Sequence, residues 1–203
     1  MMISGIEPLD RRRSKVFLDG SFAFVLYNGE LRRFSLQAGG ELGEKVYREI
    51  MDDILCRRAR ERMLHMLETR PRTEAEIRRK LKEGFFPAEA IHEVVAFALR
   101  CGYIDDEDYA RRYFEVYGDK KSRRQMAAEL KQKGIGREIT EALLEEESGD
   151  EAEKAAALLR KRRWDPENAD AGERRRAAAF LARRGFSGET ISRAMEHFSD
   201  FEW

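Results

Sequence analysis

Histidine and cysteine are the side chains with which this sequence could most readily bind a metal or attack a substrate. The three histidines, His65, His92 and His197, are scattered singly, and none forms the spacing of a metal-ligating motif with a cysteine or carboxylate. No nucleophile motif surrounds Cys56 or Cys101, and no G-x-S-x-G is present. We therefore expect no catalytic residue, no metal and no cofactor, and predict that the protein is not an enzyme.

The acidic run from Asp105 to Asp108 could be mistaken for a metal site. It lacks the glycine and the closing glutamate of a calcium loop, and adjacent side chains on a helix diverge. Acidic residues also stabilise the positive N-terminal end of a helix. We expect Asp105 or Asp106 to cap a helix whose packing face carries Tyr109, Tyr113 and Phe114.

Basic residues form the clusters that are most informative about function. Solvated helix faces explain any single cluster, but these clusters recur at related places along the chain, and equivalent positions of stacked repeats line up on one face. We predict a binding groove for a protein partner or nucleic acid, and its candidate residues are Arg78, Arg79, Lys80, Arg111, Arg112, Lys120, Lys121, Arg123, Arg124, Lys131, Lys133, Arg160, Arg162, Arg163, Arg174 and Arg175.

The charge balance narrows the class of partner. Charged residues make up 38% of the 203 residues, yet the formal net charge is zero, which argues against a protein whose main role is non-specific DNA binding. Charge is sorted along the chain: residues 111–137 contain nine Lys and Arg against three acids, and residues 138–153 contain eight acids and no base. Such a field favours a protein partner, or a protein complex that contains nucleic acid.

The elements that position these charges follow from the stretch between Ser122 and Leu144. Ser122 and Gln125 have the spacing of a capping box, and Met126 and Leu130 then share one helix face. Gly134 predicts the end of that helix, because a left-handed residue past a helix end is least strained as glycine. Ile135 then turns back onto the core, and a second helix packs through Ile139, Ala142 and Leu143.

This pattern occurs three times. A leucine is followed five residues later by an apolar turn residue, in the pairs Leu81 and Phe86, Leu130 and Ile135, and Leu181 and Phe186. Each pair leads into a helix with an apolar triplet, which is Ile91, Val94 and Val95 in the first copy and Ile191, Ala194 and Met195 in the third. The first copy departs from this pattern because Gly84 lies one position earlier than Gly134 and Gly185 would predict, which leaves Phe85 in the turn. The third copy departs because it has Glu173 where the first two copies have the caps Thr73 and Ser122.

The repeat period of roughly 50 residues leaves room for a further helix in each copy. Its candidates are residues 57–68, 107–117 and 151–163. The fold class predicted is mainly α, with tandem three-helix repeats in an elongated curved array. The predicted domains are residues 1–56, a β-meander plus helix, followed by repeats at 57–104, 105–149 and 150–203.

The first 36 residues are rich in β-formers instead. Asp19-Gly20 predicts a two-residue hairpin and Asn28-Gly29 a second one, with residues 3–7 as a further strand. So small a sheet needs a helix to pack against, and the one that starts near Glu41 is expected to serve. Gly39-Gly40 separates them.

The sequence also predicts a cellular location. No segment is long and apolar enough for a membrane span, and the first residues lack the apolar stretch of a signal peptide. Cys56 and Cys101 stand far apart in helical contexts and are expected to be reduced and buried. We expect a cytoplasmic monomer that does not contact membranes.

Four motifs, in this order along the chain, resemble those of the RecX family, the regulators of the RecA recombinase: VFLDGSFAF, RTEAEIRRKL, GYIDDEDYARRY and AAELKQKGI. The likeness covers nearly the whole length, and the last two motifs are the most specific. The resemblance implies that the protein binds the RecA filament on single-stranded DNA, lodges in its groove, and suppresses filament growth, ATP turnover and strand exchange. Weak direct DNA binding is a secondary expectation.

Two other functions remain open on the residues alone. A helix-turn-helix-like DNA-binding protein would place one helix of a repeat in the major groove and bind duplex site-specifically. A helical-repeat scaffold would bind an unrelated protein and leave RecA unaffected.

Overall fold

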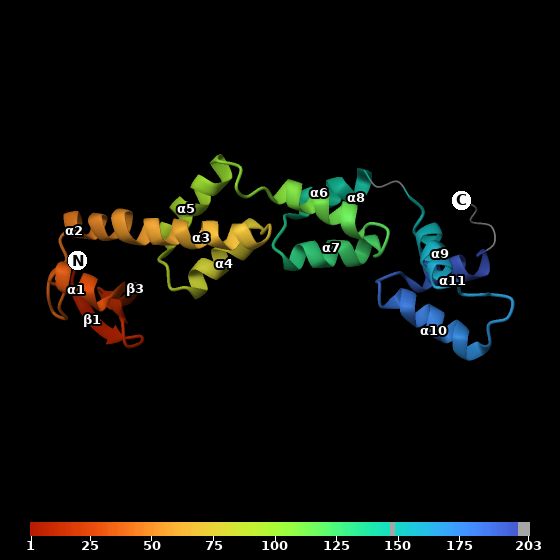
Figure 1. Ribbon diagram of the computed structural model, residues 1–203, viewed down its shortest axis with the longest axis horizontal. Helices are drawn as coiled ribbons and strands as arrows, with labels where there is room; N and C mark the ends of the chain where they lie inside the picture. Colours follow the sequence, from red (N-terminus) through yellow and green to blue (C-terminus); the bar gives the residue numbers. More distant parts are fainter. Residues whose placement is uncertain (147–148, 199–203) are drawn as a thin grey trace. The chain divides into compact units, whose positions relative to one another are not determined.

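The protein is mainly helical, with one small sheet near its N-terminus (Figure 1). The structure, a computed structural model, describes residues 1–146 and 149–198. It divides into two compact units, Met1–Asp105 and Asp106–Trp203, and each is described here by itself. No helix among the described residues combines the length and the apolarity that crossing a bilayer requires.

The N-terminal sheet contains three antiparallel strands in the order β1 (Ile3–Pro8), β2 (Arg13–Leu18) and β3 (Ser21–Tyr27). The predicted hairpin is confirmed, because β2 and β3 are joined by Asp19 and Gly20, which both have positive φ as a tight primed turn requires. The predicted strand at residues 3–7 is also confirmed. Val16 of β2 and Phe24 and Leu26 of β3 have fully buried side chains.

The second predicted hairpin is wrong. Asn28 and Gly29 begin a short helix, α1 (Asn28–Arg33), rather than a turn between strands. The Asn28 backbone N–H donates to Arg12 O, and its side chain accepts a hydrogen bond from Ser14 Oγ at 3.0 Å. Asn28 thus lies at the end of the pairing between β2 and β3. Glu30 accepts from the Tyr27 N–H and pairs with Arg58 at 2.5 Å, which secures the helix start.

One continuous helical segment covers the sheet and then enters the first repeat. It comprises α2 (Glu44–Glu49), a π-helical segment η1 (Ile50–Cys56) and α3 (Arg57–Thr69). Ile50, Met51 and Leu55 pack on the sheet, which agrees with the prediction that a helix starting near Glu41 covers it. The sequence gives no sign of the π register.

Each repeat contains three helices, as predicted. The first comprises α3, α4 (Glu74–Glu83) and α5 (Ala88–Arg100), the second α6 (Asp106–Tyr117), α7 (Arg123–Gln132) and α8 (Arg137–Glu146), and the third α9 (Glu151–Lys161), α10 (Ala171–Ala182) and α11 (Gly188–Glu196). Each repeat has its own apolar core. The curvature predicted for the array stays a prediction.

The middle helix of every repeat ends in the same turn. The residue five after the leucine of the repeat pattern donates its N–H to the carbonyl oxygen of that leucine, at 3.2 Å for Phe86, 3.0 Å for Ile135 and 3.4 Å for Phe186. The residue before it is left-handed in all three turns. In the first repeat that residue is Phe85, with φ +63°, so the early Gly84 does not shift the turn.

Helix caps differ from the prediction in two repeats. Thr73 and Glu76 form the full capping box, but Ser122 and Gln125 form only half of it. The Gln125 amide donates to Glu129 instead, and the Ser122 N–H donates to Arg184 O of the third repeat. The third repeat does have a capping box, which lies one turn earlier than the template predicts, between Asp170 and Glu173.

Two expected burials are also wrong. Cys56 is buried, but Cys101 is exposed because it follows α5 in a turn at the surface. Ala142 is exposed on α8, and Thr140 is buried there together with Leu143. The Thr140 hydroxyl donates to Gly136 O at 3.1 Å, which makes its burial tolerable.

Candidate partner-binding surface

The predicted cations of the first repeat and of α6 are neutralised by acids of the same unit. Most pairs join residues three or four apart on one helix, where such pairs contribute only about 0.2–0.5 kcal/mol each. The pairs are Arg78 with Glu74 at 2.6 Å, Arg79 and Lys80 with Glu83 at 3.9 and 2.7 Å, Arg111 with Glu107 and Glu146 at 3.2 and 3.3 Å, and Arg112 with Asp108 at 2.9 Å. These side chains are solvated and remain available to a stronger anionic partner.

Lys121 is a structural residue of the second repeat. Its Nζ lies 4.2 Å from the ring centroid of Tyr117 and 2.5 Å from Glu129, which also accepts a hydrogen bond from the Tyr113 hydroxyl. Lys120 and Lys133 rest on the rings of Tyr117 and Tyr109, at 5.8 and 5.2 Å. Lys121 therefore holds α6 against α7 rather than facing a partner.

Arg123 joins the second and third repeats. Its guanidinium donates to Gly149 O at 3.0 Å, and its backbone N–H donates to Glu151 at 2.9 Å. On the same side of the third repeat, Arg193 pairs with Asp150. Substitution of Arg123 would disturb this junction as well as any surface it contributes to.

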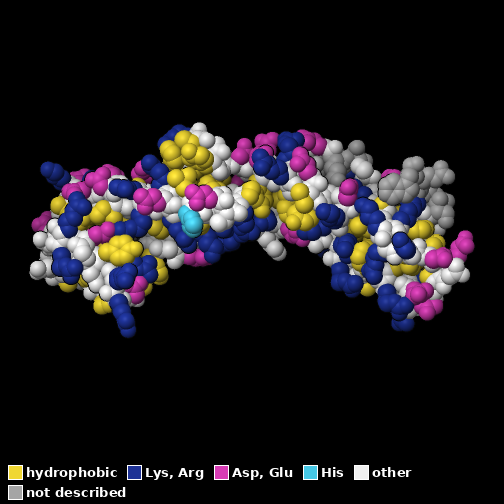
Figure 2. Space-filling view, in the orientation of Figure 1, with side chains coloured by type: hydrophobic (Ala, Val, Ile, Leu, Met, Phe, Trp, Pro, Cys, Tyr) yellow, Lys and Arg dark blue, Asp and Glu magenta, His cyan; other side chains and the backbone are white. Residues whose placement is uncertain are grey.

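The predicted arginines of the third repeat contact carbonyls and rings more than carboxylates. Arg160 donates to Phe198 O at 2.8 Å, and Arg174 donates to Pro166 O at 2.7 Å. Arg175 Nε donates to Ala171 O at 3.4 Å, and Arg162 stacks on the Phe180 ring at 4.3 Å. Figure 2 shows Lys and Arg side chains gathered over this repeat.

Three of the predicted cations are exposed, and their side chains have no ionic, carbonyl or ring partner among the described residues: Arg124 and Lys131 on α7, and Arg163 after α9. Arg163 is left-handed, with φ +56°. These residues are the ones whose charges are most available to a partner. The alignment of all sixteen cations on one face stays a prediction.

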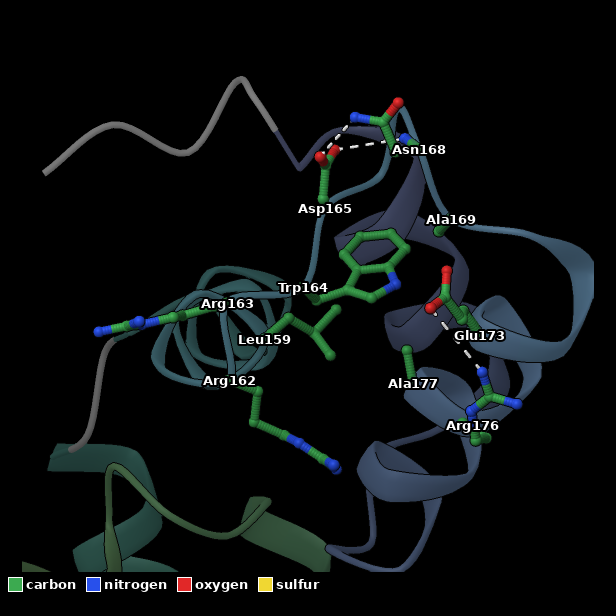
Figure 3. A pocket seen from close by; sticks show the side chains of 10 residues that line it. All are labelled: Leu159, Arg162, Arg163, Trp164, Asp165, Asn168, Ala169, Glu173, Arg176 and Ala177. Atoms are coloured by element: carbon green, nitrogen blue, oxygen red, sulfur yellow. Dashed lines mark hydrogen bonds and ion pairs between the residues drawn. The ribbon is translucent and has the colours of Figure 1, made fainter.

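A cavity of about 420 Å³ lies between the end of α9 and the start of α10 (Figure 3). The indole of Trp164 forms its wall, with its Nε1 directed to the side where Glu173 lies, while Arg162 extends below and Arg163 points away. Trp164 Nε1 is buried and has no hydrogen-bond partner among the described residues.

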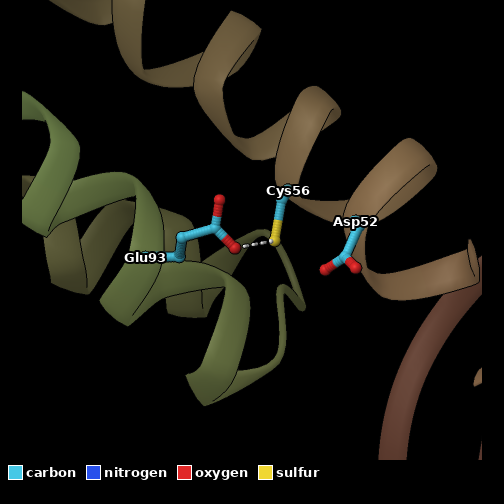
Figure 4. A group of neighbouring side chains, drawn as sticks. All are labelled: Asp52, Cys56 and Glu93. Atoms are coloured by element: carbon cyan, nitrogen blue, oxygen red, sulfur yellow. Dashed lines mark hydrogen bonds between the residues drawn. The ribbon is translucent and has the colours of Figure 1, made fainter. Parts of the chain in front are cut away.

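A second group that the sequence did not bring together lies in the first unit. Asp52 and Cys56 of η1 meet Glu93 of α5, with ligand-type atoms within 4.8 Å of one another (Figure 4). The Cys56 thiol donates to Glu93 at 3.1 Å, and burial together with that carboxylate raises the pKa of the thiol to about 12. At neutral pH the thiol thus keeps its proton and joins η1 to α5. Arg60 also lies near Glu93, at 3.8 Å, and opposes a bound cation.

Models of known protein families match the three repeats of this chain. Family models described as the first, second and third three-helix domains of RecX match residues 59–97, 105–144 and 149–195, which together are more than half of the chain. The chain belongs to the RecX family. The three RecX domains follow one another in the same order as the repeats of the structure.

Individual RecX proteins are similar over most of the chain. A protein named Regulatory protein RecX from Limosilactobacillus reuteri is 35% identical over 163 residues, which is 78% of this chain and 62% of that protein. Its namesake from Trichlorobacter lovleyi is 34% identical over 139 residues, 66% of this chain and 90% of the relative. The one from Caldanaerobacter subterraneus is 29% identical over 185 residues, 89% of this chain and 90% of the relative.

Solved RecX structures have the same fold. A crystal structure of regulatory protein RecX superimposes with a TM-score of 0.59 at 30% identity, covering 96% of this chain and 98% of that one. RecX from Lactobacillus salivarius gives a TM-score of 0.58 at 22% identity over 71% of this chain and 96% of that one, and supports the fold alone.

Proposed function

We propose that this RecX-family chain is a regulator of RecA that binds the RecA filament on single-stranded DNA in its groove and suppresses filament growth, ATP turnover and strand exchange. The observation that supports it best is the run of three RecX three-helix domains, which fills residues 59–195 in family order. The protein acts by contact rather than by catalysis, as a cytoplasmic monomer.

The distribution of charge fits this mode of action. Five of the predicted cations, in the first repeat and on α6, form weak, solvated pairs whose exchange for partner anions costs little, because a surface ion pair is worth at most about 1 kcal/mol. Several modest contacts, spread over successive repeats, would together give high avidity on a partner with repeating subunits. A RecA filament is such a partner.

The direct test is RecA-driven ATP hydrolysis on single-stranded DNA with substoichiometric amounts of the protein. We expect hydrolysis to fall well before one copy is present per RecA. Unchanged hydrolysis at equimolar protein would leave the helical-repeat scaffold as the better reading. Site-specific duplex binding that survives moderate salt would instead favour the helix-turn-helix alternative.

Charge reversal can locate the surface without unfolding the repeat. Arg124→Glu with Lys131→Glu changes two exposed residues of α7 that have no ionic partner among the described residues, whereas Arg123 is needed at the repeat junction. We expect at least a tenfold higher concentration of this variant for half-inhibition. The matched control is Arg57→Glu with Arg137→Glu, two exposed cations outside the predicted groove that already face acids.

A further inference from the structure

Three arginines of the third repeat lie together without an acid to neutralise them. The guanidinium carbons of Arg162 and Arg184 are 4.3 and 3.8 Å from the centroid of the same ring, Phe180. Arg183, next in the chain, is exposed. In the described part of the chain none of the three pairs with a carboxylate. Two guanidinium groups over one ring, with no counter-ion, are arranged for an anionic ligand.

The electrostatics of the cluster agree with this geometry. Burial lowers the pKa of the Arg184 guanidinium below its ordinary value, and the charges of Arg162 and Arg183 lower it further. These like charges repel one another. A phosphate group among them would relieve the repulsion, and guanidinium groups bind phosphate oxygens in a bidentate manner.

The Trp164 cavity adjoins this cluster through Arg162, which lines it (Figure 3). Its volume of about 420 Å³ falls within the size range of small-molecule sites, about 300–1,000 Å³. The indole provides a flat aromatic wall, and its buried Nε1–H lacks an acceptor among the described residues. A flat ligand with hydrogen-bond acceptors would satisfy both features.

The acids that line the cavity do not oppose an anion there, because each is already engaged. Asp165 accepts hydrogen bonds from Asn168 and from the Glu167 N–H, at 2.7 and 3.0 Å. Glu173 completes the capping box with Asp170 and lies 3.9 Å from Arg176. No carboxylate among the described residues thus neutralises the three arginines or the neighbouring Arg163.

We propose that the third repeat binds one nucleotide of single-stranded DNA, with the phosphodiester on Arg162, Arg183 and Arg184 and the base against Trp164. Base stacking on an aromatic side chain is the usual means of holding single strands. A duplex keeps its bases inside the stack, and an acidic peptide would offer no flat acceptor to the indole. The inference deepens the proposed function, but the binding step needs no RecA.

Tryptophan fluorescence reports this step directly. In a Trp203→Phe background, whose substituted residue lies outside the described ones, Trp164 is the remaining tryptophan. We expect saturable quenching by oligodeoxythymidylate. Arg162→Ala with Arg183→Ala should weaken binding at least tenfold and flatten the dependence of log K on log salt by about 0.7 per lost phosphate contact.

Controls separate this site from general charge attraction and from misfolding. Arg57→Ala with Arg137→Ala removes two exposed cations outside the predicted groove that already face acids, and should bind within twofold of the parent. Arg183→Ala alone leaves the contacts with Phe180 in place and should still weaken binding several-fold. Because no RecA is present, failure here leaves the ATP-hydrolysis test of the proposed function untouched.

Several results would overturn the proposal. These are no quenching by the oligonucleotide at millimolar concentration, unchanged affinity of the Arg162 and Arg183 double variant, or equal affinity for duplex DNA. Equal binding of polyglutamate would assign the site to an acidic peptide, and equal binding of an abasic oligonucleotide would show that the Trp164 cavity takes no base.

Discussion

The turns that end α4 and α10 share the hydrogen bond from the turn residue back to the leucine, but they differ in the residue at the position that has positive φ. In the first repeat Phe85 occupies it, and its ring lies 6.4 Å from that of Phe22 and 5.4 Å from Lys15 Nζ, both in the N-terminal sheet. In the third repeat Gly185 occupies it, and a Cβ there would lie 2.6 Å from Ser122 Oγ of the second repeat. Both turns dock on the module that precedes them. The Phe85 ring has room beside the sheet, whereas a side chain at residue 185 would collide with the second repeat.

The largest expected effect is that of Gly185→Ala. The new Cβ would meet Ser122 Oγ at 2.6 Å and Gln125 Cβ at 2.8 Å, in addition to the strain of positive φ. Overpacking costs about 1–3 kcal/mol and left-handed backbone about 1–2 kcal/mol, so we expect a loss of about 2–5 kcal/mol. Urea unfolding of the second unit, followed through Trp164 fluorescence, measures it.

Gly102→Ala is the matched control. Gly102 ends α5 in the same kind of turn, with φ +68°, but a Cβ there would meet nothing within 4 Å. Only the backbone strain of about 1–2 kcal/mol should appear, in the first unit. Equal losses for the two alanine variants would show that the turn of the third repeat is not a tight docking contact.

Phe85 tests the other half of the comparison. Phe85→Ala keeps the left-handed strain and loses the ring contacts, whereas Phe85→Gly loses the ring but relieves the strain. We expect the alanine variant to be less stable than the glycine variant by about 1 kcal/mol, because only glycine adopts this conformation freely. Calorimetry of the first unit would decide it. A more stable alanine variant would mean that φ at residue 85 relaxes once the ring is gone.

Substitution of Ser122 tests whether the helix cap and the contact with the Gly185 turn depend on each other. Ser122→Ala removes the acceptor for the Gln125 N–H and should cost about 1 kcal/mol. It also removes the atom nearest to a Cβ at residue 185, so the double variant with Gly185→Ala should lose less than the sum of the single losses, by at least about 0.5 kcal/mol. Strict additivity in urea unfolding would separate the two roles.

The smallest effect at neutral pH concerns the thiol that joins η1 to α5 in the first unit. Since burial and Glu93 raise the pKa of Cys56 from 9.0 to about 12, the unfolded state loses its proton before the folded state does. The contribution of this thiol is therefore fully present below pH 9, and the free energy of unfolding falls as pH rises from 9 to 12. At pH 8 we expect a maleimide to label Cys101 and to spare Cys56 until the unit is unfolded. Mass spectrometry of labelled peptides checks this, and rapid labelling of Cys56 in the folded protein would contradict it.

Local patterns were sufficient to predict the repeats. The leucine, the turn residue and the apolar triplet recur together, and each is determined by contacts within about fifteen residues. The cap at Ser122 was predicted, but its partner was not, because the Arg184 carbonyl lies 62 residues away in the sequence. The second hairpin was wrongly predicted at Asn28-Gly29 for the same reason, because Asn28 forms tertiary hydrogen bonds with Arg12 and Ser14.

The candidate surface was harder to predict than the fold. A list of cations does not show which of them a neighbouring acid, ring or carbonyl already engages, and Lys121 and Arg123 proved to be structural. Arg183 and Arg184 were not predicted, although they are adjacent in the sequence as Arg111 and Arg112 are. Trp164 was the available signal, since an aromatic residue next to two arginines is typical of nucleic-acid contacts.

The π-helical turn η1 also limits how this protein can change. Met51, Leu55, Ala59 and Met63 follow one another at steps of four and are all buried, although residues four apart drift around a regular α-helix by about 40° per step. A turn that holds more residues takes up this drift. Deletion of one residue here, such as Asp53, would rotate everything beyond it by about 100° relative to the sheet. We therefore infer that this segment tolerates changes of side chain far better than changes of length.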